Sequence, residues 1–320
     1  MRATQRRSFR VRAGTAQLSP TSHPGAARGG TGRPALTGVL LTLPALLLVA
    51  GAIVFPIGWT VVISLNGPDY ALTGEADFVG LANYLRIAAS PDFIAALLQT
   101  LGFVAAGLVL EAAIAVPVAL ALHRGVAGTR VFRAIVALPL MVAPVVGALA
   151  WRFVFGDGYG MIDSLAAWLG GDGPLWFADI WLARAAILIA GLWLALPFDI
   201  LLLLAGLASL PGEPMEAARV DGASRMQALR LVVLPLLRPV ILIIVVVRLA
   251  DAFRIFDLVY VLTGSGPANS TDVLSTYIYR QMFNGFDFAG GTAASVMLVG
   301  LTSLASLLAV VALRERWRRA

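Results

Sequence analysis

Six apolar stretches, each about as long as a bilayer is thick, constrain this chain more than any other feature. A helix needs about 20 apolar residues to cross a hydrocarbon core. In the 320-residue chain the stretches run approximately over residues 38–65, 93–122, 131–155, 181–207, 237–262 and 289–313. Backbone polar groups in lipid must be bonded within their own segment, so each stretch is expected to be helical. The sequence predicts an all-α polytopic membrane protein with six transmembrane helices.

Arginine is distributed unevenly among the segments between these stretches. Residues 1–33 contain seven arginines and residues 314–320 contain four, and the segment between the fourth and fifth stretches has Arg219, Arg225, Arg230 and Arg238 in or beside it. The alternate segments carry Arg86 and Arg280 against Asp69, Glu75, Asp77, Asp92, Asp157, Asp163, Asp172, Asp272 and Asp287. Basic segments stay on the cytoplasmic side. We therefore expect a multi-pass protein of the inner or plasma membrane with both termini in the cytoplasm.

The composition argues against several other classes. The chain is 59% hydrophobic and 13% charged, whereas soluble domains carry about a quarter charged residues. It has no cysteine, and its histidines, His23 and His123, lie outside the apolar stretches. A phosphate-binding glycine loop and a nucleophile–base pair are both missing from the sequence. The sequence predicts no catalytic residue, metal or cofactor, and the +6 net charge follows the membrane pattern rather than that of a nucleic-acid-binding protein.

The longest polar interruption in the C-terminal half, residues 211–239, predicts two short helices joined by a turn. Glu216 falls near the positive N-terminus of the first helix. Asp221 and Gly222 form a turn signal, and Ser224 with Gln227 predicts a capping box for the second helix. A compact helix–turn–helix between two membrane-length stretches is typical of a docking element.

The spacing in this segment resembles the EAA signature of permease subunits of ATP-binding-cassette (ABC) importers. The matching pattern is Glu216-Ala217-Ala218, three residues, Gly222, nine residues, Val232, one residue, then Leu234-Pro235. The resemblance implies that residues 208–236 form a coupling loop that sits in a cleft of a cytoplasmic ATPase. It assigns the coupling role to Glu216, Ala217, Ala218, Asp221, Gly222 and Pro235. A capped amphipathic loop without a docking role is the alternative.

Other segments resemble the carbohydrate-uptake branch of this family, which includes the maltose and glycerol-phosphate permeases. Residues 78–84 are similar to its FVGL-NY element, and residues 93–100 to its F…NT element, with Gln99 in place of asparagine. Residues 256–267 are close to its FD-IY-LTGGGP element, with Ser265 in place of the middle glycine. The coupling loop departs from the pattern at Leu229 and Val233, where an aromatic residue and threonine are usual. The resemblance covers residue 38 to the C-terminus.

Four charged residues recur at every third position of the fifth stretch: Arg248, Asp251, Arg254 and Asp257. Neighbours at this spacing can pair on a helix. A charge at the bilayer centre costs about 2.5–3.5 kcal/mol, so the four are expected to face other helices or a wet cavity. On an ideal helix the first and last of these residues, nine positions apart, point about 180° away from each other. One narrow face of the helix is therefore not expected to contain all four charges.

Two interpretations of these charges stay open. They line a solute path, with hydroxyl groups bound by the charged side chains and a sugar face stacked on Phe253 or Phe256, or they form a self-neutralised ladder that fixes packing against a partner subunit. For the isolated carboxylates Glu111 and Asp199 a packing role is favoured. The candidate solute-path residues are Asp251, Arg254, Phe256, Asp257 and Asp199.

The resemblance implies a permease that works with a second, similar permease, two cytoplasmic ATPase subunits and an extracytoplasmic solute-binding protein. The implied cargo is a sugar, oligosaccharide, polyol or glycerol phosphate, moved by alternating access. Residues 1–33 are expected to be a disordered basic tail and residues 34–320 the lipid-embedded transmembrane domain. The alternatives are a permease for a non-carbohydrate solute and, from another class, a secondary transporter or a membrane-bound transferase. Neither of the latter two explains the Glu216–Pro235 spacing.

Overall fold

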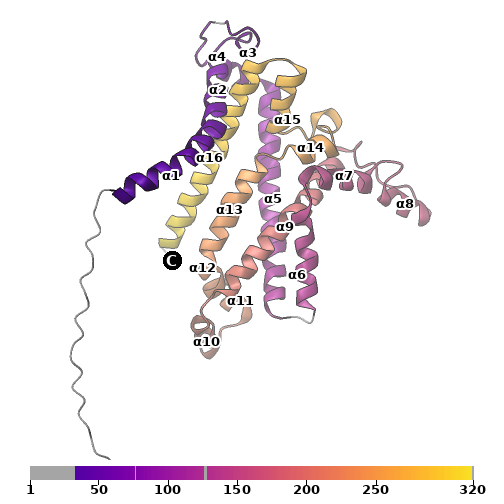
Figure 1. Ribbon diagram of the computed structural model, residues 1–320. Coiled ribbons are helices and arrows are strands. Elements are labelled where there is room, and N and C mark those ends of the chain that lie inside the picture. The colour runs from indigo at the N-terminus through magenta and orange to yellow at the C-terminus, as the bar shows by residue number, and fades with distance from the viewer. Residues whose placement is uncertain (1–32, 76, 126–127, 319–320) are drawn as a thin grey trace, which may run out of the picture. The chain divides into compact units, whose positions relative to one another are not determined.

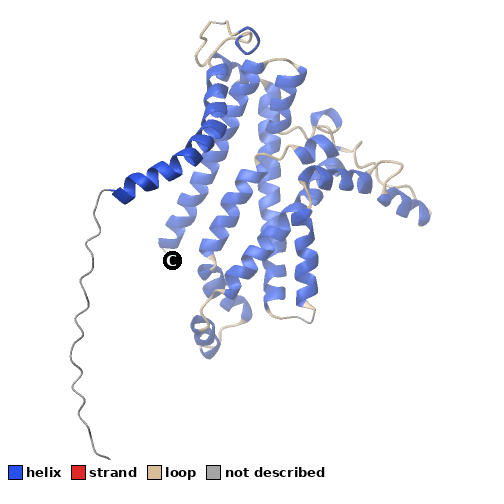
Figure 2. Cartoon of the chain, in the orientation of Figure 1, coloured by secondary structure: helices blue, strands red, loops and turns tan. Residues whose placement is uncertain are grey.

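The computed structural model describes residues 33–75, 77–125 and 128–318, and no strand is present among them (Figures 1 and 2). One isolated bridge joins Asn66 to Phe78. The predicted helical class is therefore confirmed, and the predicted tail, apart from Arg33, lies outside the described residues. The polar segment at residues 211–239 is called the Pro211 loop. The elements before it are α1 (Arg33–Val49), η1 (Ala50–Val54), α2 (Phe55–Ser64), α3 (Tyr70–Thr73), α4 (Ala82–Ala88), α5 (Pro91–His123), α6 (Thr129–Ala137), η2 (Leu138–Met141), α7 (Pro144–Phe155), α8 (Met161–Trp168) and α9 (Ile180–Ala208).

The Pro211 loop and the C-terminal part of the chain are also helical. Their elements are α10 (Glu213–Val220), α11 (Arg225–Ala228), η3 (Leu229–Val233), α12 (Leu234–Leu236), α13 (Arg238–Ala252), α14 (Asp257–Leu262), η4 (Pro267–Asn269), α15 (Leu274–Tyr279), η5 (Arg280–Asn284) and α16 (Phe288–Arg318). The chain divides into two units between Val54 and Phe55. The described elements of the first unit are α1 and η1, and all the others belong to the second.

The described residues contain four helices that are long and apolar enough to cross a membrane. They are Val39–Ser64, Pro91–His123, Ile180–Ala208 and Phe288–Arg314. Two bent pairs also qualify: Thr129–Met141 with Pro144–Phe155, bent by 104°, and Arg225–Leu236 with Arg238–Ala252, bent by 69°. Counting each pair as one span gives six candidates. The fifth differs from the predicted stretch at residues 237–262, because it begins inside the Pro211 loop and ends before α14.

Proline accounts for the position of both bends. Val142 and Ala143 are extended, with ψ of 125° and 140°. Pro144 disfavours the helical conformation in Ala143, the residue directly before it. At the second bend Pro239 stands in the first turn of α13, where its missing N–H interrupts the hydrogen-bond ladder from the preceding turn. These prolines stand inside apolar stretches that otherwise predict continuous helices.

Within the second unit, α5 contacts α4, α6, α9, α13 and α15, and it runs through the bundle beside α9 (Figure 1). Its longest contact is with α9. Ala115 and Ala119 of α5 are buried in one cluster with Ile200 and Leu204 of α9, and such small side chains let helix backbones approach closely in a membrane. The α9 helix begins at Asp179, whose carboxylate accepts hydrogen bonds from the backbone N–H groups of Trp181 and Leu182.

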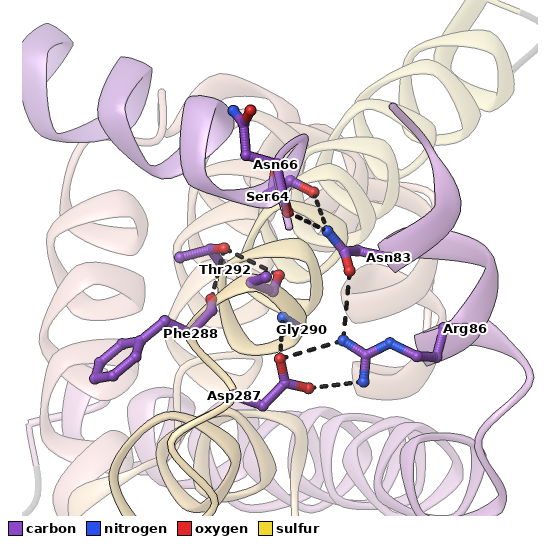
Figure 3. Close-up of polar contacts among 9 residues, drawn as sticks. Ser64, Asn66, Asn83, Arg86, Asp287, Phe288, Gly290 and Thr292 are labelled. Carbon is purple, nitrogen blue, oxygen red and sulfur yellow. Dashed lines mark hydrogen bonds and ion pairs between the residues drawn. The ribbon is translucent and has the colours of Figure 1, made fainter. Parts of the chain in front are cut away.

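A polar cluster fastens the ends of α2, α4 and α16 to one another (Figure 3). The buried Asn83 side chain donates hydrogen bonds to the carbonyl oxygens of Ser64 and Asn66, both at 2.9 Å. Arg86, one turn further along α4, donates two hydrogen bonds to Asp287, at 2.7 and 3.2 Å. The cluster therefore joins the end of α2 to the start of α16 through α4.

Asp287 also caps α16. Its Oδ1 accepts a hydrogen bond from the backbone N–H of Gly290 at 2.8 Å. Partial burial raises the pKa of the Asp287 carboxyl, but the hydrogen bonds from Arg86 and Gly290 and the arginine charge outweigh it and lower the pKa overall. The carboxylate form is therefore stabilised by the folded state.

Candidate functional site

A cavity of about 590 Å³ lies between α5, α9 and the α13–α14 segment. Its wall also includes Pro139 and Pro144, on either side of the bend between α6 and α7. Most of the lining side chains are apolar, and the charged exceptions are Glu111, Arg248, Asp251, Arg254 and Asp257. An apolar hollow with a few convergent polar groups is the usual form of a small-molecule site.

The charged residues of this cavity form a short chain of ion pairs. Arg248 Nε donates to Asp199 Oδ1 at 2.9 Å, and its Nη1 lies 3.6 Å from Asp251 Oδ2. Arg254 Nη2 donates to Asp251 Oδ1 at 3.3 Å. Asp251 and Arg254 are 49% and 70% exposed, whereas Asp199 is only 2% exposed. The chain of pairs therefore runs from the protein core at Asp199 into the cavity at Arg254.

Of the predicted solute-path residues, Asp251, Arg254, Phe256 and Asp257 line the cavity. Asp199 is not part of the wall; it lies behind it and holds Arg248, as the packing interpretation of an isolated buried carboxylate expects. Of the three expected pairs at i,i+3 spacing, those between Arg254 and Asp251 and between Arg248 and Asp251 form. Among the described residues no ion pair joins Arg254 to Asp257.

The expectation that one face cannot contain all four charged positions is wrong, because it assumed a continuous helix. α13 ends at Ala252 and α14 begins at Asp257, and all four charged residues line the cavity. Side chains satisfy two carbonyl groups at this break. Arg254 Nε donates to the Ala250 carbonyl at 3.1 Å, and Ser275 Oγ donates to the Ile255 carbonyl at 3.2 Å.

Of the two predicted aromatic residues, Phe256 lines the cavity and Phe253 does not; Phe103 of α5 is a second aromatic residue in the wall. Phe253 is 2% exposed and packs in a core cluster with α5, α15 and α16. The Phe256 ring lies in the cavity wall and stacks on Tyr260 with ring centroids 5.2 Å apart. Tyr279 contacts both rings, at 5.3 and 5.1 Å. This packing fixes the orientation of the Phe256 ring.

Glu111 and Arg248 also belong to the cavity wall. Arg248 is one of the four charges of the solute-path interpretation but not one of the candidate residues, and for Glu111 the sequence favours a packing role. Glu111 Oε2 is buried and has no hydrogen-bond partner among the described residues. In the sequence, Glu111 is a single carboxylate in an apolar stretch. That observation does not show which helix its side chain faces. The position of Arg248 depends on its contact with Asp199, 49 residues earlier in the chain.

The α10–α11 segment forms a second candidate site. α10 begins at Glu213 with Pro214 in its first turn, and its first turn is acidic at Glu213 and Glu216. Ser224 and Gln227 make the predicted capping box, with bonds of 3.3 and 2.8 Å between each side chain and the other residue's backbone N–H. The predicted helix–turn–helix is thus present.

The residues assigned to coupling lie on or beside these helices. Glu216 and Ala217 are exposed on α10, and Ala218 beside them is half-buried. Asp221 is the exposed C-cap of α10, and Gly222 follows with φ of +75°. Pro235 lies in the first turn of α12, after η3. The turn needs Gly222 in the left-handed region, which glycine adopts without strain.

No group of three or more His, Asp or Glu side chains that could hold a metal occurs within the described ranges. The described helices are those of a polytopic membrane protein, with a charged cavity among them. A family model of the "binding-protein-dependent transport system inner membrane component" matches residues 112–319. The chain belongs to this family: it is a permease subunit of an ABC importer, as the resemblance implied.

Similar proteins include sugar and glycerol-phosphate permeases. The trehalose/maltose transport system permease protein MalF of Thermococcus litoralis is 36% identical over 265 residues, which cover 83% of this chain and 89% of that protein. The trehalose transport system permease protein SugA of Mycobacterium tuberculosis is 34% identical, covering 83% and 84%. The sn-glycerol-3-phosphate transport system permease protein UgpA of Yersinia enterocolitica is 34% identical, covering 82% and 90%.

Solved structures share the fold. A crystal structure of a bacterial ABC transporter involved in the import of the acidic polysaccharide alginate matches with a TM-score of 0.75. The match covers 88% of this chain and 96% of that chain at 23% sequence identity.

Proposed function

We propose that this permease carries a polyhydroxylated solute, such as a sugar, oligosaccharide, polyol or glycerol phosphate, through the cavity beside α13 and α14. The observation that carries the proposal is the presence of Asp251, Arg254 and Asp257 in one cavity with the ring of Phe256. Carboxylates accept and guanidinium groups donate hydrogen bonds to hydroxyl groups. The apolar face of a sugar ring packs on an aromatic side chain. The names of relatives that are 34–36% identical, trehalose/maltose and glycerol phosphate among them, support the same solute class.

An uptake assay with matched phenylalanine variants tests the solute site. Phe256→Leu removes the ring from the cavity, and an aromatic contact contributes about 0.5–1.5 kcal/mol. We therefore expect the apparent affinity for the solute to fall by about twofold to tenfold. Phe153→Leu is the control, because Phe153 is 70% exposed on α7 and does not line the cavity. Equal affinities in the two variants would remove Phe256 from the solute site, and uptake of amino acids or metal ions but no sugar would favour the non-carbohydrate alternative.

The α10–α11 segment is the proposed docking site for an ATPase subunit. Glu216, at the exposed and electropositive end of α10, is suited to accept hydrogen bonds from basic groups of a partner. Ala217 and Ala218 leave that surface low enough for close approach. Asp221 and Gly222 set the turn, and Pro235 starts the helical turn that leads back to the membrane.

Exchange of the Glu216 charge tests this assignment. Glu216→Lys opposes the α10 dipole, which accounts for about 0.3–1 kcal/mol, and repels a basic partner. We expect normal membrane insertion, weakened co-purification of the ATPase subunits and loss of ATP hydrolysis stimulated by the loaded binding protein. Glu213→Lys is the control, because Glu213 stands in the same first turn of α10 and its exchange opposes the same dipole, but it is not part of the EAA pattern. Unchanged coupling in Glu216→Lys would refute the docking role.

The proposed assembly contains this chain, a second similar permease, two cytoplasmic ATPase subunits and an extracytoplasmic binding protein. The proposed topology has six spans with both termini in the cytoplasm, supported by the arginine distribution. Reporter fusions after Arg130 and Arg225 should report the cytoplasm, and those after Asp172 and Asp272 the opposite side. One reversed pair would refute this topology.

Transport follows if the solute and the ATPases bind two conformations of the permease with different affinities. ATP-driven closure of the ATPases moves both coupling loops and shifts the permease between inward-open and outward-open states. The shift is limited by the difference in binding free energy between these states, and the coupling is reciprocal.

A further inference from the structure

A second cavity, of about 690 Å³, lies behind α10, where α5 and α9 end. Its basic lining residues are His123, Arg124, Arg219 and Arg225, and Glu216 is its only acidic one. No ion pair involves any of these residues within the described part of the chain. Three arginines and one glutamate thus line a single hollow.

The rest of this cavity is apolar. Leu120 belongs to the last turn of α5 and the buried Leu207 to the last turn of α9. Leu210, Met215, Leu229 and Val233 complete the apolar lining. Both α5 and α9 are long and apolar enough to span a membrane, so their ends lie near the level of lipid headgroups. The cavity therefore combines apolar surface from the spans with positive charge at headgroup depth.

We propose that this cavity binds an anionic phospholipid, with the phosphate among the arginines and an acyl chain against Leu120 and Leu207. Basic hollows between transmembrane helices are suited to acidic headgroups. Arginine binds phosphate through paired N–H donors. An acidic side chain of a protein partner would satisfy the charge but would leave the apolar wall uncovered. The lipid is the occupant that matches both halves of the site.

The site would connect the membrane to the coupling loop. The headgroup bridges Arg124, at the end of α5, to Arg219 and Arg225 on either side of the α10–α11 turn. A bound lipid then restrains the position of this segment against the spans. The inference does not depend on the proposed solute or on the docking role of Glu216, because lipid binding is measured without transport.

The test is a binding titration of the purified full-length chain in a neutral detergent without a sugar headgroup. The probes are a fluorescent phosphatidylglycerol and a phosphatidylcholine with the same label and acyl chains. We expect saturable binding of phosphatidylglycerol only. Arg124→Gln should raise its half-saturating concentration about fivefold, as expected for one basic group near an acidic headgroup. Arg230→Gln is the matched control, because Arg230 is also exposed and unpaired but does not line the cavity.

Further measurements separate lipid binding from a structural defect, from binding of a free phosphate and from binding of the ATPase. Arg124→Lys should retain most of the binding if charge is what matters, whereas a purely structural defect would not be rescued. Free glycerol phosphate should not displace the lipid, and phosphatidylglycerol should remain bound when the ATPase subunits are added. Equal binding of phosphatidylcholine, equal affinities of Arg124→Gln and Arg230→Gln, or displacement by glycerol phosphate or by the ATPase would each overturn the proposal.

Discussion

Replacing Asp199 by asparagine is expected to destabilise the permease by about 3 kcal/mol. The Asp199 side chain is 2% exposed and that of Arg248 is 13% exposed, and Arg248 Nε donates to Asp199 Oδ1 at 2.9 Å. Removing one partner of a buried ion pair typically costs about 3–5 kcal/mol, because the other charge stays buried and uncompensated. The lower value applies here because Arg248 keeps a second carboxylate, Asp251, 3.6 Å away.

A double-mutant cycle isolates the contribution of the pair. Asp199→Leu with Arg248→Met removes both charges and leaves apolar side chains, a change that is often neutral or stabilising for a buried pair. The double variant should therefore be more stable than either of its single variants, Asp199→Leu or Arg248→Met, by about 2 kcal/mol or more. Arg248 also lies over the Phe198 ring, 4.9 Å from its centroid, and the methionine side chain preserves part of that contact.

Chemical unfolding of the purified protein, followed by helical circular dichroism, gives the required free energies. Asp257→Asn is the control, because Asp257 makes no ion pair within the described residues and its charge supports only the first turn of α14. Its loss should cost no more than about 1 kcal/mol. If Asp199→Asn matches this control, or if the double variant shows the sum of its single effects, the pair does not stabilise the fold as argued.

Three further predictions concern the cavity, the coupling loop and the polar cluster. Asp251→Asn should reduce solute uptake more than Asp257→Asn, since Asp251 contacts two guanidinium groups; equal uptake would exclude the ion pairs from transport. Gly222→Val should lower the free energy of unfolding by about 1–2 kcal/mol and weaken ATPase co-purification, because φ is +75° and a side chain is strained there. Gly212→Val, at φ of −72°, should have neither effect. Equal effects of the two changes would show that the positive φ of Gly222 is not the cause. The lowered pKa of Asp287 means that its stabilising effect is present above about pH 4 and is lost as pH falls through the folded pKa. The thermal stability of wild type should therefore approach that of Asp287→Asn on acidification, and a constant difference would contradict this.

The local features of the proposed coupling loop, residues 208–236, could be predicted because short-range interactions determine them. The Ser224–Gln227 capping box and the positive φ of Gly222 depend on residues within three positions of each other. Helical class and the approximate positions of the spans follow from the length of the apolar stretches for the same reason. A capping box and a membrane-length apolar stretch can both be recognised from neighbouring residues alone.

Partners that are distant in the chain could not be predicted. Asp199 pairs with Arg248 across 49 residues, and Arg86 pairs with Asp287 across 201. The sequence shows that each charge needs a partner, since isolated charges are costly in a membrane. It does not show which of several arginines or carboxylates the helix packing brings near. The place of Glu111 in the cavity wall depends in the same way on which helices pack beside α5.

The break between α13 and α14 shows how an exact periodicity can mislead. On a continuous helix, Arg248 and Asp257 are separated by about 180° and cannot share a face. Neither proline nor glycine occurs between Ala252 and Asp257, so nothing local in the sequence predicts that the helix ends there. The carbonyl group of Ile255 is instead satisfied by Ser275 from α15, a tertiary contact that makes the break tolerable. With α13 ending at Ala252 and α14 beginning at Asp257, Asp257 lines the same cavity as Arg248. Charges that would spiral around a continuous helix thereby share one cavity wall. Removing the Ser275 hydroxyl should destabilise the break that makes this possible, although among the described residues Ser275 forms no hydrogen bond with any of the four charges.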